Sequence, residues 1–217
     1  MVIDQDFNEI VSLGSWCQTA YQIRKYFGTK AQPFDWWVTP TIGLIEVLES
    51  QFSDLFIPSN MRVVVEDAGK AVMCSRYGIM HYHDFDEAKL NGEIFEFLVR
   101  AKSINNLSKY SHLITRFLNM SGKVLFIRVG SGTVQYYNKN QELDDLLLVR
   151  LQRALQLLLP NCEVHILLLN SYYTPSYIPP NVYHSVVNNY DLSDVWYGSE
   201  QGWKEMFESL KIRMVNN

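Results

Sequence analysis

The nine residues IVSLGSWCQ, from Ile10 to Gln18, decide the fold class. Their first half is a short apolar run that closes at Gly14, a pattern typical of a buried strand. Ser15 follows, and Gln18 stands three residues after it, which is the spacing of a capping box at the start of a helix. The stretch therefore predicts a strand that passes directly into a helix, as in α/β proteins.

The predicted helix has one apolar side and a clear end. Its apolar residues recur at helical spacing, at Trp16, Ala20, Ile23 and Phe27. Gly28 supplies the left-handed residue that commonly follows a helix. The next segment, QPFDWW at residues 32–37, is rich in aromatic residues, and Pro33 favours an extended backbone there. We interpret it as an ordered loop.

The rest of the chain alternates between helical and extended patterns. In order, we expect a helix capped at Thr39, extended structure at 61–85, helices at about 91–101 and 109–120, a strand at 124–128, a helix from Leu143 to Leu158, strands at 164–169 and about 183–187, and a C-terminal helix with Trp203 and Leu210. Strands separated by helices need crossover connections. We therefore predict an α/β fold with a mostly parallel sheet and helices on both faces, in a Rossmann-like three-layer arrangement. One domain should span residues 1–217.

Composition excludes two classes of function. The formal net charge is −4, and no dense cluster of Lys and Arg exists that would attract nucleic acid. No apolar run approaches the ~20 residues that a membrane-spanning helix needs, and the N-terminus is acidic where a secretory signal would be basic. We expect a cytoplasmic protein that acts on a small-molecule, peptide or glycan substrate. The sequence leaves the oligomeric state open.

The predicted strand order gives a predicted site. In open parallel sheets, ligands bind beyond the carboxyl ends of the strands. The residues at these ends are Gly14, Ser15, Trp16, Cys17 and Gln18 after the first strand, Arg128 and the Gly130–Thr133 loop after the strand at 124–128, Asn170 after the next, and Asn188 and Asn189 after the last. A thiol, a guanidinium and several amides should therefore share one edge of the sheet.

Cys17 is the candidate nucleophile. With Ser15 as the cap it would be the second helical residue, where unpaired N–H groups and the helix dipole lower a thiol pKa. The backbone from Gly14 to Trp16 could hold an oxyanion in acyl transfer. The alternative is that Cys17 is an apolar filler between strand and helix. Cys74 and Cys162 are expected in packing or surface positions, and all three cysteines as free thiols.

A cysteine nucleophile needs a base, and His81 and His83 are the candidates. Both should point to the same side of an extended segment. The imidazole would be held by a carboxylate or amide, for which Asp35, Asp84 and Asn170 are available. The remaining histidines have other expected roles: a packed one for His165, a solvated one for His112, and an open one for His184.

Two segments also carry patterns found in metal or phosphate sites. His81, His83 and Asp84 form the pattern H-x-H-D, but no third separate metal ligand is evident, so we predict no metal site. The Gly130–Thr133 loop lacks the lysine of a phosphate-binding P-loop, so we expect a turn.

Five motifs in order resemble a known family. They are Ser12-Leu13-Gly14 with Cys17, Pro33-Phe34-Asp35-Trp36, Gly43-Leu44, His83-Asp84-Phe85, and Val124 to Arg128. Together, over roughly residues 9–170, they resemble a bacterial family of uncharacterised proteins described as papain-like cysteine peptidases. The resemblance implies a nucleophile at Cys17 and a base at His83, with Asp35 or Asp84 in support and no cofactor. Trp36 would then lie on the substrate side.

Two rival hypotheses remain. The strand and helix start at residues 10–20 is similar to that of polysaccharide-modifying acyltransferases, which implies coenzyme A as a cofactor. The other hypothesis is a non-catalytic module whose aromatic loops grip a carbohydrate, through Phe34, Trp36, Trp37, Tyr172, Tyr173 and Tyr177.

Overall fold

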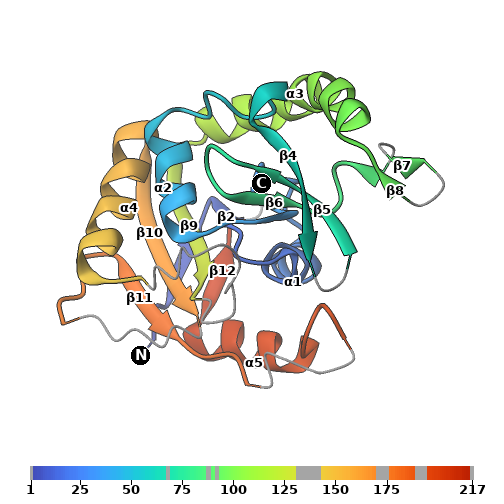
Figure 1. Cartoon of the computed structure of the whole chain (residues 1–217). Helices are drawn as coiled ribbons and strands as arrows, with labels where there is room; N and C mark the ends of the chain where they lie inside the picture. The colour runs from blue at the N-terminus through green and yellow to red at the C-terminus, as the bar shows by residue number, and fades with distance from the viewer. Residues whose placement is uncertain are drawn as a thin grey trace.

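The computed structural model describes residues 2–66, 69–86, 89–90, 93–130, 143–169, 176–188 and 195–215. Strands and helices alternate along the chain, and the main elements are labelled in Figure 1. Their bounds are β1 (Gln5–Phe7), β2 (Glu9–Ser12), α1 (Cys17–Phe27), β3 (Trp37–Val38), α2 (Thr41–Glu49), the short 3-10 helix η1 (Pro58–Asn60), β4 (Met61–Glu66), β5 (Gly69–Cys74), β6 (Ile79–His81), β7 (Lys89–Leu90), β8 (Glu93–Ile94), α3 (Glu96–Leu118), β9 (Gly122–Val129), α4 (Asp145–Leu158), β10 (Cys162–Leu169), β11 (Val182–Ser185), α5 (Glu200–Leu210) and β12 (Ile212–Met214).

A four-stranded parallel sheet forms the centre of the fold. Its strand order is β11-β10-β9-β2, and every pairing in it is parallel. All side chains from Val124 to Val129 in β9 are buried, as expected for a strand covered on both faces. The predicted strands around residues 10–13, 124–128, 164–169 and 183–187 are therefore confirmed, and so is their parallel direction.

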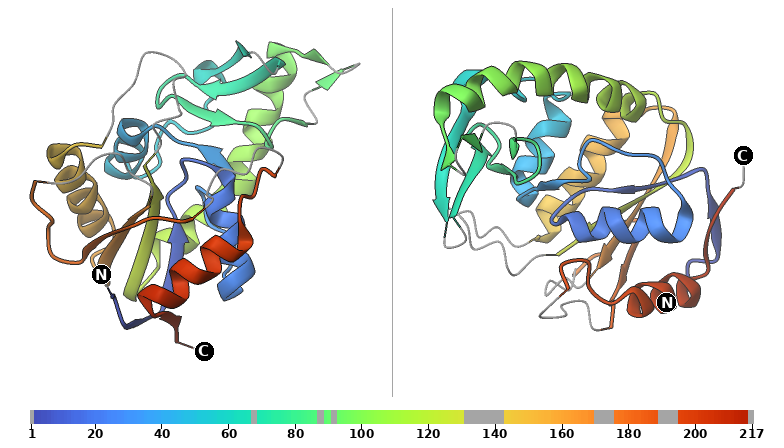
Figure 2. Two further views of the ribbon diagram at one scale, coloured as in Figure 1. Left: turned by 90° about the horizontal axis from the view of Figure 1, so that it is seen from below. Right: turned by 90° about the vertical axis from the view of Figure 1, so that its right-hand side faces the viewer.

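Helices pack on the two faces of this sheet through alternate residues of the strands. Val124 and Phe126 of β9 belong to the same core as α2 and α4, whereas Leu125 and Ile127 pack with α1 and α5. This alternation follows from the period of two in a strand. Figure 2 shows the helices around the sheet from two sides. The Rossmann-like class of the fold and the single domain stay predictions.

The extended segment at residues 61–85 forms a second sheet, which corrects the prediction of one mostly parallel sheet. Its order is β3-β6-β5-β4, and all its pairings are antiparallel. The reason is local: β5 and β6 are joined by a turn of four residues that ends at Gly78, whose φ is +68°. Parallel strands cannot be joined so briefly, because their connection must cross the sheet.

One helix, α3, replaces the two that the sequence predicts between residues 91 and 120. Polar side chains in the segment between the two predicted helices are hydrogen-bonded inside the fold, so the helix continues through it. Ser103 Oγ donates to Val99 O at 2.7 Å, and Asn106 Nδ2 donates to Asp84 O at 3.0 Å. In the part of the chain that the structure describes, no helix is both long and apolar enough to cross a membrane.

A parallel pair of strands, β1 and β12, was missed from the sequence. Both are only three residues long, too short for a periodic signal. Arg213 of β12 donates to Asp4 at 2.9 Å and to Asp6 at 2.5 Å, so charged side chains accompany this backbone pairing.

Candidate active site

The turn between β2 and α1 has an unusual backbone. Gly14 and Ser15 both adopt left-handed conformations, with φ values of +76° and +72°. The helix therefore starts at Cys17, with Trp16 as a cap residue that makes no side-chain cap bond. The predicted capping box of Ser15 and Gln18 is wrong. In this conformation the Ser15 hydroxyl turns toward the sheet and donates to Val129 O at 2.6 Å.

Thr39 and Arg128 hold this turn from inside the protein. The Ser15 N–H donates to Thr39 Oγ1 at 3.1 Å, and the Thr39 hydroxyl lies 3.1 Å from Leu13 O, to which it donates. Arg128 Nη1 donates to Leu13 O at 2.9 Å and to Thr39 Oγ1 at 2.6 Å. Arg128 is only 2% exposed, so it supports the turn from below, whereas we expected it at the open edge of the sheet.

The Cys17 thiol is half-buried at the first position of α1. Burial raises the pKa of this thiol, and the backbone N–H groups of Cys17 and Gln18, which favour the thiolate, only partly oppose that effect. The expectation of a lowered pKa is therefore wrong for the protein without substrate. The helix start acts in the predicted direction, but desolvation of the sulfur outweighs it.

Of the backbone N–H groups expected to bind an oxyanion, those of Gly14 and Ser15 already have partners in the turn, whereas those at the start of α1 lack helical acceptors. The Gly14 N–H donates to Ser12 Oγ at 3.2 Å, and the Ser15 N–H is taken by Thr39. These two amides are engaged inside the turn. The backbone from Trp16 onward lies at the N-terminus of α1, where helical N–H groups lack helical acceptors, so the candidate donors move from Gly14 and Ser15 toward the helix start.

Cys17 shares a partly exposed stripe of α1 with Tyr21 and Arg24. On one side of the stripe, the Tyr21 ring packs against Trp196 and Tyr197, with ring centroids 5.2 and 5.1 Å apart. These aromatic rings form the first wall of a groove along α1.

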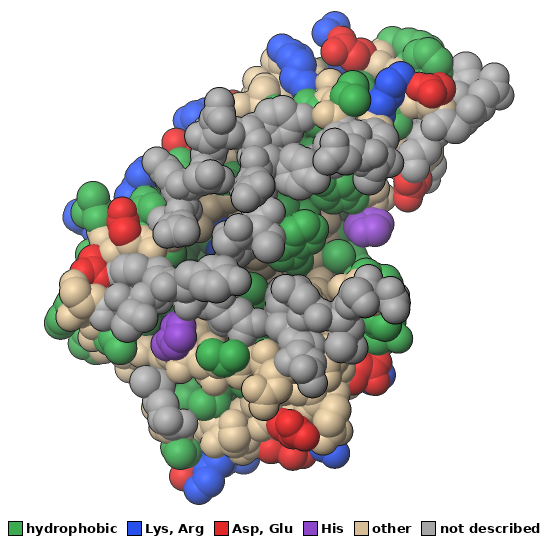
Figure 3. All heavy atoms as spheres, turned by 60° about the horizontal axis from the view of Figure 1, so that its bottom comes forward, with side chains coloured by type: hydrophobic (Ala, Val, Ile, Leu, Met, Phe, Trp, Pro, Cys, Tyr) green, Lys and Arg blue, Asp and Glu red, His purple; other side chains and the backbone are tan. Residues whose placement is uncertain are grey.

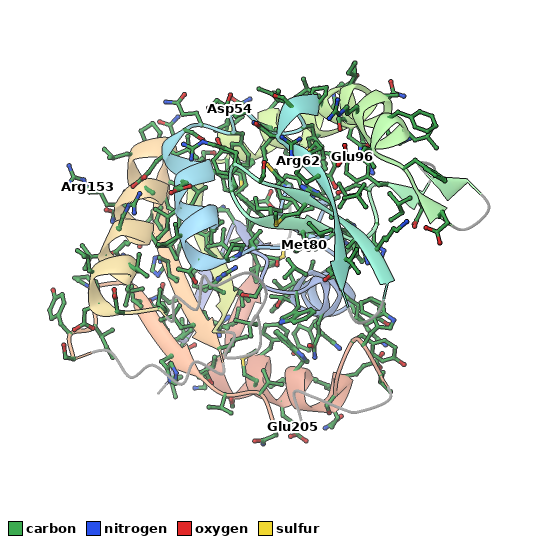
Figure 4. The ribbon with its side chains drawn as sticks, in the orientation of Figure 1. Asp54, Arg62, Met80, Glu96, Arg153 and Glu205 are labelled. Atoms are coloured by element: carbon green, nitrogen blue, oxygen red, sulfur yellow. The ribbon has the colours of Figure 1, made fainter. Side chains whose placement is uncertain are left out.

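The second wall comes from the loop before β3 and the segment after β6. The Arg24 guanidinium lies 5.5 Å from the centre of the Trp36 ring, and that ring contacts His83 with centroids 5.6 Å apart. Trp16 packs beside Met80, which Figure 4 labels between the antiparallel sheet and α1. Figure 3 shows a hollow between the part of the molecule with the antiparallel sheet and α3 and the part with α5, with hydrophobic side chains on its floor and a histidine at its edge.

His81 and His83 do not share an environment, contrary to our expectation. His83 is exposed beside Trp36, whereas His81 is 1% exposed. Met80 of β6 packs on the side of Trp16, so the next residue along the strand faces the opposite side of the sheet. His81 accordingly contacts the rings of Trp37, Phe56 and Phe85 in the core.

Asp84 is the centre of a buried polar network. Its Oδ1 accepts from Tyr110 Oη at 2.7 Å, and its Oδ2 accepts from Trp37 Nε1 at 2.9 Å and lies 3.0 Å from His81 Nδ1. Burial opposes ionisation, but the hydrogen bonds of His81 and Tyr110 and the positive charge of Lys109 lower the pKa of Asp84 to about 2. Its carboxylate is thus committed to the core.

Asp35 is also engaged within the protein. Its carboxylate pairs with Arg24 and accepts the Gln32 N–H at 2.8 Å. Burial raises the pKa of Asp35, although the Gln32 N–H and the Arg24 charge act in the opposite direction. Arg24 also stacks on Trp36, whose ring contacts His83. By pairing with Arg24, Asp35 therefore stabilises the side of the groove on which His83 lies.

Several predicted residues lie elsewhere or outside the described residues. Asn170, residues 131–133, Tyr172, Tyr173 and Asn189 fall in ranges that the structure does not describe. Cys74 is buried, and His165 is buried with Glu163 at 2.8 Å and Tyr183 at 3.0 Å, which confirms packed roles for both. Within the described ranges no three His, Cys, Asp or Glu side chains are grouped to hold a metal ion. Phe34 and Trp37 are fully buried, so neither can grip a carbohydrate.

The prediction that Thr39 caps a helix is wrong, because the cap residue of α2 is Pro40 and makes no side-chain cap bond. The sequence did not indicate the actual role of Thr39, or the roles of Tyr110 and Asn106. Each lies far along the chain from the residue that it supports, and hydroxyl and amide side chains carry no periodic signal. The only local hint was that Tyr110 is a polar residue within the helix predicted at about 109–120, whereas Asn106 falls between the two predicted helices.

Comparison with known proteins identifies the family. A family model described as "Putative papain-like cysteine peptidase (DUF1796)" matches residues 8–172, which is well over half of the chain. No curated protein and no solved structure matches the sequence. The matched range includes Cys17, Asp35, His83 and Asp84. The resemblance noted from the motifs is thereby confirmed, and the chain belongs to the family that this model describes.

Proposed function

We propose that the protein is a cysteine-dependent hydrolase in which Cys17 is the nucleophile and His83 the base. The observation that carries the proposal is the position of Cys17: a half-buried thiol at the first residue of a helix, on a partly exposed stripe between two aromatic walls. A cysteine that served only as filler would be expected among the apolar core residues, as Cys74 is.

His83 is a better candidate for the base than His81, because it lies on the same side of the antiparallel sheet as the partly exposed stripe of α1. It is exposed and contacts Trp36, which stacks with Arg24 of the same helix stripe as Cys17. His81 faces the core on the other side of the antiparallel sheet. Asp84 follows His83 directly, and its buried bonds fix the backbone that presents the imidazole. Asp84 and Asp35 therefore support the base through position.

The chemistry follows from the raised pKa of the thiol. Since Cys17 is mostly protonated at neutral pH, His83 must remove its proton as the sulfur attacks the acyl carbon. The new C–S bond forms while the carbonyl electron pair moves onto oxygen, which N–H groups at the start of α1 stabilise. As the carbonyl re-forms, the bond to the leaving group breaks and His83 gives that group the proton. His83 then takes a proton from water, which attacks the thioester; the C–S bond breaks, the acid is released and the thiol regains its proton.

Acyl transfer would differ from hydrolysis in the final acceptor alone. The same Cys17 thioester could pass its acyl group to a sugar hydroxyl, with coenzyme A carrying the donor. We favour hydrolysis because the family match is to peptidases and extends over residues 8–172, whereas the likeness to acyltransferases is confined to residues 10–20.

The test uses p-nitrophenyl acetate, an activated ester that reports acylation without knowledge of the natural substrate. The native protein should release nitrophenolate in a burst and carry an acetyl group on Cys17, detected by mass spectrometry of its peptides. Cys17→Ala should abolish both signals. Cys162→Ala, which changes another half-buried thiol, is the matched control and should leave them intact. Equal acetylation of Cys17 and Cys162 would contradict the proposal.

The base is tested by a second pair of variants. His83→Gln should lower the acylation rate at least ~100-fold, the usual contribution of a general base. His112→Gln, at an exposed histidine of α3, is the control and should retain the native rate. If both variants acylate alike, another group accepts the proton.

A further inference from the structure

Thr39 lies at the centre of the contacts that hold the Cys17 turn, although it belongs to a different segment of the chain. It is fully buried directly after β3, while the turn follows β2. Its hydroxyl accepts from the Ser15 N–H and from Arg128 Nη1, and donates to Leu13 O. One side-chain oxygen therefore bonds the two residues that flank Gly14 and also the Arg128 guanidinium.

The turn itself is a strained conformation that needs such support. Serine is disfavoured in the left-handed region, because its Cβ crowds the following carbonyl. Gly14, the preceding residue, is also left-handed, and a Cβ on it would lie 2.4 Å from Thr39 Oγ1. The hydroxyl thus approaches the backbone so closely that only glycine fits, and the bonds of Ser15 to Thr39 and Val129 offset the strain.

We propose that Thr39 is a positioning residue for the nucleophile: by holding Gly14 and Ser15 in left-handed conformations, it sets the direction in which α1 begins and so places the Cys17 sulfur. The inference rests on the proposed function in treating Cys17 as the nucleophile. Its measured consequence, the reactivity of the Cys17 thiol, does not depend on any substrate. Arg128 acts with Thr39, since its Nη2 also donates to Thr39 O at 2.6 Å.

The turn determines two properties of Cys17 that can be measured. One is the set of N–H groups of Cys17 and Gln18 that favour the thiolate. The other is the outward position of the side chain on the groove stripe. If the start of α1 shifts while the sulfur stays half-buried, the N–H groups that oppose the effect of burial are lost, so the thiol pKa should rise and the thiol should react more slowly.

The experiment follows alkylation by iodoacetamide at each cysteine by peptide mass spectrometry, in the native protein and in Thr39→Val and Thr39→Ser. Thr39→Val keeps the shape of the side chain and removes the hydroxyl, and Thr39→Ser restores the hydroxyl. We expect Cys17 to react at least about fivefold more slowly in Thr39→Val, with recovery in Thr39→Ser, because the thiolate fraction sets the rate. The pH profile of the Cys17 reaction should move to higher pH in Thr39→Val.

The other two cysteines separate positioning from general loosening. Cys162 is half-buried in β10 and serves as an internal reference, whereas Cys74 is buried and reacts only when the fold opens. A purely structural role for Thr39 would speed Cys74 and Cys17 together. The proposal is overturned if Cys17 in Thr39→Val reacts at the native rate or faster.

A second pair keeps the inference testable if Thr39→Val does not fold. Ser15→Gly and Ser15→Ala both remove the hydroxyl bond to Val129, but only glycine accepts a positive φ without strain. We expect Cys17 to react faster in Ser15→Gly than in Ser15→Ala, and equal rates would overturn the proposal. The proposed function fails in a separate experiment. If Cys17→Ala keeps the burst with p-nitrophenyl acetate, Cys17 is not the nucleophile, and this result does not depend on the alkylation rates.

Discussion

At the scale of single residues, the environment of Cys17 decides how the site can work. Burial raises the thiol pKa, and the two N–H groups at the start of α1 do not compensate for it. In the proposed mechanism, the thiolate therefore forms as His83 removes the proton. This separates the site from one that stores a thiolate–imidazolium pair before substrate binds.

The pH dependence of Cys17 alkylation tests this interpretation. Because the folded pKa lies above its ordinary value, the thiolate fraction should rise about tenfold for each pH unit through neutral and mildly alkaline pH. The rate of iodoacetamide labelling at Cys17 should thus increase continuously from pH 6.5 to 9. A plateau already reached near pH 7 would mean that an ion pair with a histidine exists in the resting protein.

Residue patterns predicted part of this site. The position of Cys17 after a strand and at a helix start was available from IVSLGSWCQ, because strand and helix periods are local. The left-handed Ser15 was not, since serine rarely adopts positive φ without support. That support comes from Thr39, Arg128 and Val129, which are distant in sequence, so no local pattern contains it.

At the scale of elements, α2 packs so closely on the antiparallel sheet that a glycine is required in its first turn. A Cβ at Gly43 would lie 1.9 Å from Tyr77 O, in the turn between β5 and β6. A glycine inside a helix normally weakens it, so here the close approach of backbone to backbone outweighs helix propensity.

Gly43→Ala should therefore destabilise the protein by about 1–3 kcal/mol through overpacking, where helix propensity alone would predict a gain of about 1 kcal/mol. Urea denaturation followed by circular dichroism measures the difference. Asn105→Ala, at an exposed position of α3, is a control in which propensity alone acts, and it should be neutral or slightly stabilising. A stabilised Gly43→Ala would show that α2 can move away from the turn.

The sequence predicted the elements that have a long apolar run or a regular apolar face. It did not predict the short strands that form only by pairing with another strand. The strands β9 and β10 carry long apolar runs, and α4 and α5 have clear apolar faces, so each was found near its true bounds. The short strands β3 and β6 are defined by pairing with each other over a long separation in sequence. The direction of such pairing depends on the connections, which the alternation of residues does not reveal.

At the scale of the whole molecule, Asp84 links three parts of the fold. It bonds Trp37 of β3, His81 of β6 and Tyr110 of α3, and all of these side chains are buried. The antiparallel sheet and the helix above it are therefore joined through one ionised carboxylate. Its pKa of about 2 makes the stability of this arrangement sensitive to acid.

The sign of the acid effect follows from the lowered pKa. The contribution of the Asp84 charge to the free energy of unfolding is complete above pH ~4 to 5 and is lost as the pH falls through about 4 to about 2, amounting to about 2 kcal/mol. Asp84→Asn should be less stable than the native protein at pH 6, and the difference between them should shrink toward pH 2.5. Urea denaturation at several pH values measures it, and a constant difference would exclude this carboxylate as a source of acid sensitivity.

The groove along α1 is built from segments far apart in the sequence: the thiol is at position 17, and the rings of Trp196 and Tyr197 come much later in the chain. During synthesis on a ribosome, Cys17 thus leaves the exit tunnel long before its second wall exists. A nascent chain carries the sulfur without the surface that would align a substrate beside it. A fragment that stops before Trp196 would therefore keep the thiol and lack this wall.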